Sequence, residues 1–172
     1  MNSKLIILSL LELGLAILLG VMVLYAAYSI LNQMVFKKYS IKKDNLAFAI
    51  LASAVLFSVG NIMEGSIEPI ADVIRQLSGA YDNLTTIAFQ SIKYILMFLL
   101  IGVVLAFIIN AISIKLFTTL TKVNEFEEIA QDNIAPAIVT GAIAIIISMF
   151  AKGPAVQLMQ AIIPYPELPG IL

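Results

Sequence analysis

Long apolar stretches separated by short polar ones dominate the chain. Four of them could cross a membrane, at roughly residues 5–33, 46–63, 94–118 and 134–151, because about 20 apolar residues are needed to cross a hydrocarbon core of ~30 Å. A backbone in lipid must satisfy its own hydrogen bonds, and the stretches show no alternation typical of barrel strands. The pattern therefore predicts an all-α integral membrane protein with four transmembrane helices.

The same pattern occurs twice, with an offset of 88 residues. Residues Ile41–Ile50 align with Ile129–Ile138 and share I-x-x-D-N-[LI]-A-x-A-I at the head of an apolar run. A repeat of this length makes each copy one structural unit. Since each copy holds two spans, we expect two tandem parallel two-helix repeats, residues 1–78 and 91–172, joined by a linker at 79–90.

The segments that follow the second and fourth spans differ from each other. In residues 64–78, apolar residues recur at helical spacing and charged residues fall on the opposite face, which predicts an amphipathic helix at the membrane interface or on neighbouring helices. Residues 154–163 are apolar nearly all round and end in Pro164-Tyr165-Pro166, a helix stop. We expect this short apolar segment to be buried or re-entrant.

Composition agrees with a membrane protein. Hydrophobic residues make up 61% of the chain and charged residues 12%, against about 45–50% and about 25% in soluble domains. A net charge of −1 argues against a nucleic-acid partner. The chain lacks cysteine and histidine, the usual thiolate ligand and the commonest general base. We therefore expect no enzyme activity, catalytic residue, metal site or cofactor.

Basic residues indicate how the chain is oriented. The first apolar run is longer than a signal-peptide core, with only the weak pair Ala26-Ala27 as a cleavage site, so we interpret it as a retained span. The loops at 34–45 and 119–133 then share one side. That side has six basic residues, including Lys115 at the end of the third span, against four on the other. The pairs Lys37-Lys38 and Lys42-Lys43 favour a cytoplasmic first loop, which leaves both termini outside.

Each repeat carries an acidic–amide pair where a helix should begin. The residues of this structural motif are Asp44, Asn45, Asp132 and Asn133. Their side-chain oxygens can accept hydrogen bonds from the free N–H groups of a first helical turn, and this capping role needs no ligand. The alternative is that paired helix N-termini form a binding site at the cytoplasmic face.

Small residues follow the motif in both copies. Ala49-xxx-Ser53 superposes on Ala137-xxx-Gly141. Small residues four apart let membrane helices approach closely, so all four are predicted to lie at helix contacts.

Three polar residues stand inside the spans: Glu12, Asn61 and Asn110. Such residues are costly in lipid and should face other helices or a wet path. Glu12 is the only carboxylate within an otherwise apolar run, and we favour snorkelling or helix contact over ion or proton handling. For Asn61 and Asn110 we expect hydrogen bonds between helices.

One known family combines these features. The D-N-x-A-x-A signature at the start of a span, the Thr119-Leu120-Thr121 turn, the Glu127-Glu128 pair before Asp132-Asn133, and the two tandem two-helix units resemble the YjfL-like bacterial inner-membrane proteins, the family called domain of unknown function 350. The likeness covers essentially the whole chain and is closer in the second half. It implies a four-helix inner-membrane protein, and no activity or catalytic residue comes with it.

Two functions fit this pattern. We favour a non-enzymatic multi-pass protein that acts as an oligomeric membrane anchor or assembly subunit, with the lipid bilayer, copies of itself and a cytoplasmic protein as partners. The alternative is an oligomeric ion channel or small-solute transporter, since four helices alone enclose little room for a pore. The two differ in whether the polar residues of the spans pair with one another or line one wet cavity.

Overall fold

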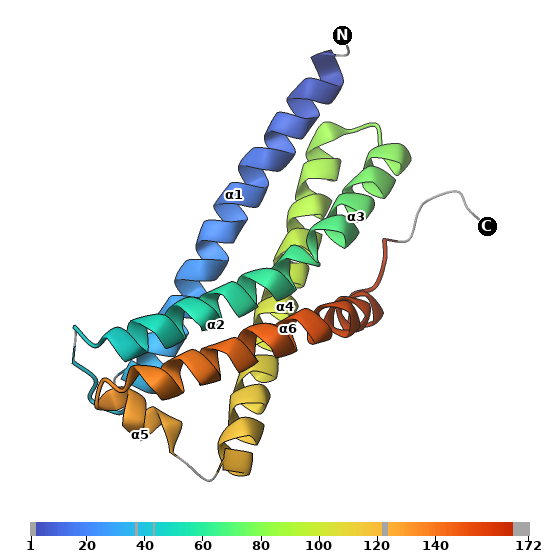
Figure 1. The fold of residues 1–172 in the computed structure, drawn as a ribbon. Coiled ribbons are helices and arrows are strands. Elements are labelled where there is room, and N and C mark those ends of the chain that lie inside the picture. Colours follow the sequence, from blue (N-terminus) through green and yellow to red (C-terminus); the bar gives the residue numbers. More distant parts are fainter. Residues whose placement is uncertain (1–2, 37, 43, 122–123, 167–172) are drawn as a thin grey trace.

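The computed structural model consists of helices and connecting turns. It describes residues 3–36, 38–42, 44–121 and 124–166, without the side chains of residues 3–12, 15 and 34. The elements in chain order are α1 (Ser3–Leu31), the π-helix η1 (Asn32–Phe36), α2 (Leu46–Glu64), α3 (Ile67–Ala80), α4 (Leu84–Thr121), α5 (Glu125–Ala130) and α6 (Ile134–Ile162). No strand occurs in these described ranges, so the part of the chain they cover is all-helical (Figure 1).

Three described helical segments are long and apolar enough to cross a membrane. They are Leu46–Ala80, which joins α2 and α3, then α4, and α6. The stretch Ala16–Leu31 of α1 forms a shorter apolar helix. Helices of this length and hydropathy are typical of membrane spans and are unfavourable in water, so the chain is a membrane protein.

Helices α2 and α6 lie side by side and run in the same direction (Figure 1). Their starts are joined by a hydrogen bond from the N–H of Ala47 to Asp132, and an ion pair joins Glu64, at the end of α2, to Lys152, past the middle of α6. Helix α4 packs against both. The main core lies at these contacts and includes Phe48, Leu51, Val55, Val59, Ile62, Ala106 and Ala137.

A second, smaller core forms where α3 turns back on α4. The buried residues Val73 and Leu77 of α3 pack with Tyr94 and Phe98 of α4 and with Met159 of α6. The polar face of α3 is more exposed and carries an ion pair between Arg75 and Asp72, with an N–O distance of 2.8 Å. The apolar face of this amphipathic helix is therefore covered by neighbouring helices.

Helix α4 begins earlier than its apolar run. It starts at Leu84, so residues 84–90 of the expected linker are helical and only 81–83 connect α3 to α4. The Oδ1 atom of Asn83 accepts a hydrogen bond from the N–H of Thr85 at 3.0 Å and so supports this early start. With 38 residues, α4 is about 57 Å long at ~1.5 Å per residue. Hydropathy indicates where the apolar part of α4 begins, whereas the helix itself begins about ten residues earlier.

Residues 154–163 do not form the separate buried or re-entrant segment that we expected. Helix α6 runs through Pro154 to Ile162. A proline removes one helical hydrogen bond, but membrane helices tolerate it where neighbouring helices pack around the site. Here Ala155 and Met159, just beyond the proline, are buried against the bundle.

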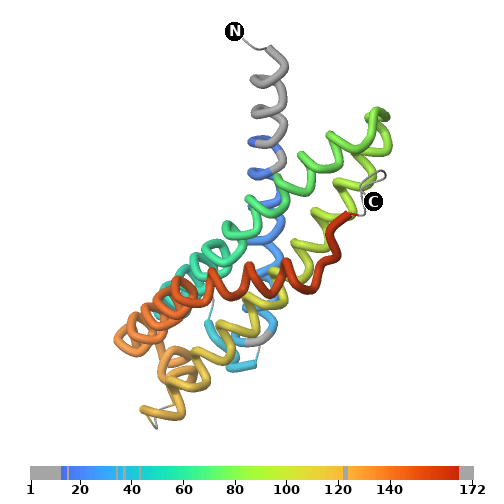
Figure 2. The backbone as a smooth tube through the Cα atoms, turned by 90° about the vertical axis from the view of Figure 1, so that its right-hand side faces the viewer, coloured from blue at the N-terminus to red at the C-terminus, as the bar shows by residue number. Residues whose placement is uncertain are grey.

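Helix α1 joins the bundle by one end only. Val23, Ala27 and Leu31, in its second half, are buried, whereas Leu13 and Ile17 are exposed. Figure 1 shows α1 diverging from α2 and α6 toward the N-terminus, and Figure 2 shows α2 and α6 side by side from a second direction. The described side chains at Leu13 and Ile17 are therefore not covered by the other helices.

Candidate functional site: the polar contacts between α2 and α6

Asn45 links the start of α2 to the segment before α6. Its Oδ1 accepts a hydrogen bond from the N–H of Phe48 at 2.5 Å, which caps α2. Its Nδ2 donates to the carbonyl oxygen of Ile129 at 2.7 Å and to that of Ala130 at 3.3 Å. Because Asn45 is buried, one amide both begins α2 and satisfies two carbonyl groups at the end of α5.

The corresponding pair in the second half is used differently. The Oδ1 of Asp132 accepts a hydrogen bond from the N–H of Ala47 at 2.9 Å, so Asp132 supplies an acceptor to α2 instead of to its own helix. Asn133 caps α6 by accepting from Ala135 at 3.3 Å, and its Nδ2 donates to Glu128 at 3.0 Å. Asp44, the fourth residue of the motif, is exposed.

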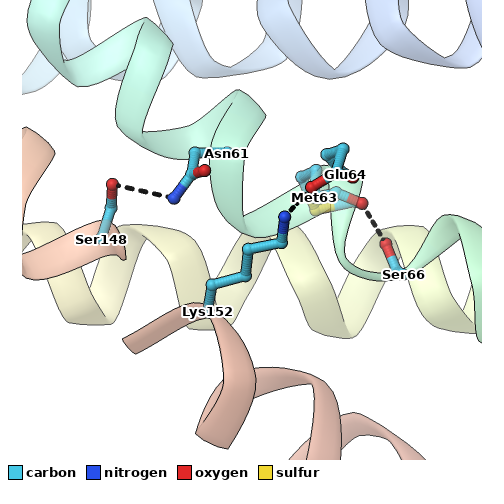
Figure 3. Close-up of polar contacts among 6 residues, drawn as sticks. All are labelled: Asn61, Met63, Glu64, Ser66, Ser148 and Lys152. Carbon is cyan, nitrogen blue, oxygen red and sulfur yellow. Dashed lines mark hydrogen bonds and ion pairs between the residues drawn. The ribbon is translucent and has the colours of Figure 1, made fainter. Parts of the chain in front are cut away.

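A second polar cluster joins the end of α2 to the part of α6 beside it (Figure 3). The Nδ2 of Asn61 donates a hydrogen bond to the Oγ of Ser148 at 3.3 Å. One turn further along, Lys152 forms an ion pair with Glu64. The side chain of Lys152 is 33% exposed and that of Glu64 is 60% exposed, so this pair lies at the edge of the contact and is partly solvated.

Glycines permit the close approach between these helices. A Cβ atom at Gly141 would lie 2.8 Å from the Cβ of Ala54, and one at Gly65 would lie 2.6 Å from the Cγ2 of Val156. On α4, a Cβ at Gly102 would lie 2.7 Å from the Sδ of Met63. All three distances are shorter than ordinary side-chain contacts. The requirement for glycine is strictest at Gly141, because the Cβ of Ala54 is fixed to the backbone, whereas the end of the Met63 side chain beside Gly102 could move.

Only one of the two predicted small-residue edges lies in this contact. Ala137 and Gly141 of α6 are buried, but Ala49 and Ser53 of α2 are exposed. Ala49 and Ser53 therefore lie outside the α2–α6 contact, and their predicted role at a helix contact stays a prediction. Gly141 faces Ala54, which is the neighbour of Ser53, the residue equivalent to Gly141 in the first repeat. One residue corresponds to about 100° of rotation around a helix axis, so Ser53 and Ala54 lie on different faces of α2.

The other intramembrane candidates lie apart from this cluster. Asn110 of α4 donates from Nδ2 to the carbonyl oxygen of Ala106 at 2.8 Å, within its own helix. The expected hydrogen bond between helices is not formed because Asn110 lines a cavity instead of facing a polar neighbour. Glu12 lies in α1, but its side chain is outside the described residues.

The chemistry available at the α2–α6 contact is that of structural hydrogen bonds and one ion pair. Sequence reasoning singled out Asn45 and Asn61 but missed their partners on the other helix. The offset of 88 residues could have indicated a different contact, the ion pair, because it places Glu64 directly over Lys152. Within the described ranges, no three side chains of aspartate, glutamate, histidine or cysteine lie close enough together to hold a metal ion.

These observations define the class of the protein. It is a helical membrane protein in which polar side chains join two parallel helices. The chain belongs to the family described as Domain of Unknown Function (DUF350), whose family model matches residues 3–153. Comparison with curated proteins and with solved structures found no match.

Proposed function

We propose that this chain is a non-enzymatic multi-pass protein of the bacterial inner membrane that acts as an oligomeric anchor or assembly subunit for partner proteins. In this proposal it crosses the bilayer four times, with α1 as the first span and two tandem parallel two-helix repeats. Both termini lie outside, and the lysine-rich segment before α2 faces the cytoplasm, as the positive-inside rule favours.

The pairing of polar side chains supports this function. Asn61 is bonded to Ser148, and Glu64 is paired with Lys152. A conducting pathway needs polar groups or backbone oxygens along its length, whereas the cavity between α1, α2 and α4 has mainly apolar walls. Polar groups used as contacts between helices are what a scaffold requires.

The shape of α1 supports self-association. Its first half stands apart from the bundle (Figure 1), and added Cβ atoms at Gly14 and Gly20 would meet nothing within 4 Å. In a membrane this surface faces either lipid or another protein. A second copy packed against it would complete the burial of α1 and produce the proposed homo-oligomer.

Orientation is tested by labelling with an impermeant thiol reagent in intact cells. The native chain has no cysteine, so single Lys42→Cys and Asp82→Cys variants report cleanly. We expect Asp82→Cys to label and Lys42→Cys to be protected. Labelling at position 42 with protection at position 82 would reverse the orientation.

The function is tested by capture in mild detergent, with measurement of particle size and identification of co-purifying proteins. We expect a particle larger than one chain, and Lys42→Glu combined with Lys43→Glu should weaken partner capture. Arg75→Glu, on α3, should leave capture unchanged. A flux through liposomes containing the purified protein that depends on Glu12, tested with Glu12→Gln, would favour the channel or transporter instead.

A further inference from the structure

A cavity of about 640 Å³ lies between the end of α1, η1, the first half of α2 and the second half of α4. Its walls are formed mainly by aliphatic and aromatic side chains, among them Val55, Val103, Phe107 and Ile114. The volume falls within the range of ~300–1,000 Å³ that is typical of small-molecule sites. Its apolar walls suit a hydrocarbon chain better than a hydrated ion.

Two lysines line this cavity. Lys38 follows η1, and Lys115 lies near the end of α4. Both side chains are exposed, and neither forms an ion pair with an acidic side chain in the described part of the chain. The aromatic rings of Tyr39 and Phe126 stack at 5.6 Å and also contribute to the walls. The cavity therefore combines apolar walls with two positive charges that have no acidic partner.

Asn110 adds an unpartnered acceptor to the same wall. Its residue is only 3% exposed, and its Nδ2 is used by the carbonyl oxygen of Ala106. Its Oδ1 has no hydrogen-bond partner among the described residues. Since Asn110 precedes Lys115 by five residues on α4, it lies about 7.5 Å deeper along the helix axis at ~1.5 Å per residue. A buried acceptor is costly without a donor, and a molecule in the cavity could supply one.

We propose that this cavity binds an anionic phospholipid from the leaflet on the lysine side. The lipid phosphate lies between the ammonium groups of Lys38 and Lys115, and an acyl chain follows the apolar walls past Val103 and Phe107. A hydroxyl or amine of the headgroup, or a water bound with it, donates to Asn110 Oδ1. A free phosphate would leave the apolar volume unfilled, and phosphatidylcholine has neither net negative charge nor a donor group.

The test uses the full chain, purified and delipidated in mild detergent, with native mass spectrometry as the readout. We expect dioleoyl phosphatidylglycerol to bind at one site per chain and to raise the melting temperature, whereas dioleoyl phosphatidylcholine should do neither. The double variant Lys38→Gln/Lys115→Gln should weaken phosphatidylglycerol binding about tenfold, because each basic residue near an anionic headgroup strengthens the attraction. The matched control Lys42→Gln changes an exposed lysine that does not line the cavity and should leave binding unchanged.

A second variant tests the cavity itself. Ala111→Trp should fill space beside Asn110 and reduce phosphatidylglycerol binding while both lysines remain. An unchanged particle size and a lipid-free melting temperature near that of the parent chain will show that the variants fold. Equal binding of the two lipids, full binding by the lysine double variant, or displacement by soluble glycerol phosphate alone would overturn the proposal. If these variants reduce the oligomer size without reducing lipid binding, the cavity surface would be a contact with a second copy of the chain. That result would also overturn the proposal.

Discussion

The starts of α2 and α6 share a sequence motif but differ in what their side chains touch. Asn45 is buried and bonds to the carbonyl groups of Ile129 and Ala130, whereas Asn133 is exposed and bonds to Glu128. The difference arises because the short helix α5 precedes α6 and places its C-terminal carbonyls beside the start of α2. A local capping signal can thus serve its own helix in one half and connect two helices in the other.

The two repeats also differ in charge, at the ion pair that joins the end of α2 to α6. Glu64 and Lys152 are 88 residues apart and form an ion pair. Two parallel helices packed in register place equivalent positions next to each other, so identical charges there would repel. Different charges at such a position avoid this repulsion, and here the two repeats carry opposite charges.

The largest effect that separates the two halves should come from the small-residue edges. Gly141→Leu should destabilise the protein by about 3 kcal/mol, because even a Cβ atom would lie too close to Ala54 and overpacking is costly. Ser53→Leu, at the equivalent but exposed position, should change stability by less than about 0.5 kcal/mol. Thermal unfolding in detergent measures both, and equal losses would mean that the two edges are equally buried in the assembled protein.

A smaller difference is expected between the two capping amides. Asn45→Ala should cost about 2 kcal/mol, since it removes a helix cap and also the side-chain hydrogen bonds to the carbonyl groups of Ile129 and Ala130. Asn133→Ala should cost about 0.5–1 kcal/mol, as for an exposed cap. Denaturant titration of the two variants decides this, and a larger loss for Asn133→Ala would contradict the assigned roles.

The smallest effect concerns the charge pair. Glu64→Lys should cost roughly 1 kcal/mol or less, because it places two like charges together at a partly exposed position. Adding Lys152→Glu to that variant should restore most of the lost stability by forming the pair in reverse. A double-mutant cycle measured by thermal unfolding gives the coupling, and zero coupling would show that the pair adds nothing to the α2–α6 contact.

Several features of the fold follow from short stretches of sequence. Helices α2 and α6 begin at Leu46 and Ile134, directly after the Asp-Asn pairs, because a cap followed by an apolar run is a local signal. Other helix limits could not be predicted from hydropathy. The early start of α4 at Leu84 is supported by the hydrogen bond from the N–H of Thr85 to Asn83, whereas the continuation of α6 past Pro154 depends on the bundle that buries Ala155 and Met159.

The sequence by itself determined that this is a helical membrane protein, which family it resembles and where two of its helices begin, since hydropathy, motif and capping depend on residues close together in the chain. Only the tertiary structure decided which face of each helix is buried, that Asp132 serves α2, that Ser148 and Lys152 are the partners of Asn61 and Glu64, and that Asn110 borders a cavity. These features depend on how helices far apart in sequence are rotated and placed against each other, and a rotation of one residue, about 100°, exchanges a buried side chain for an exposed one.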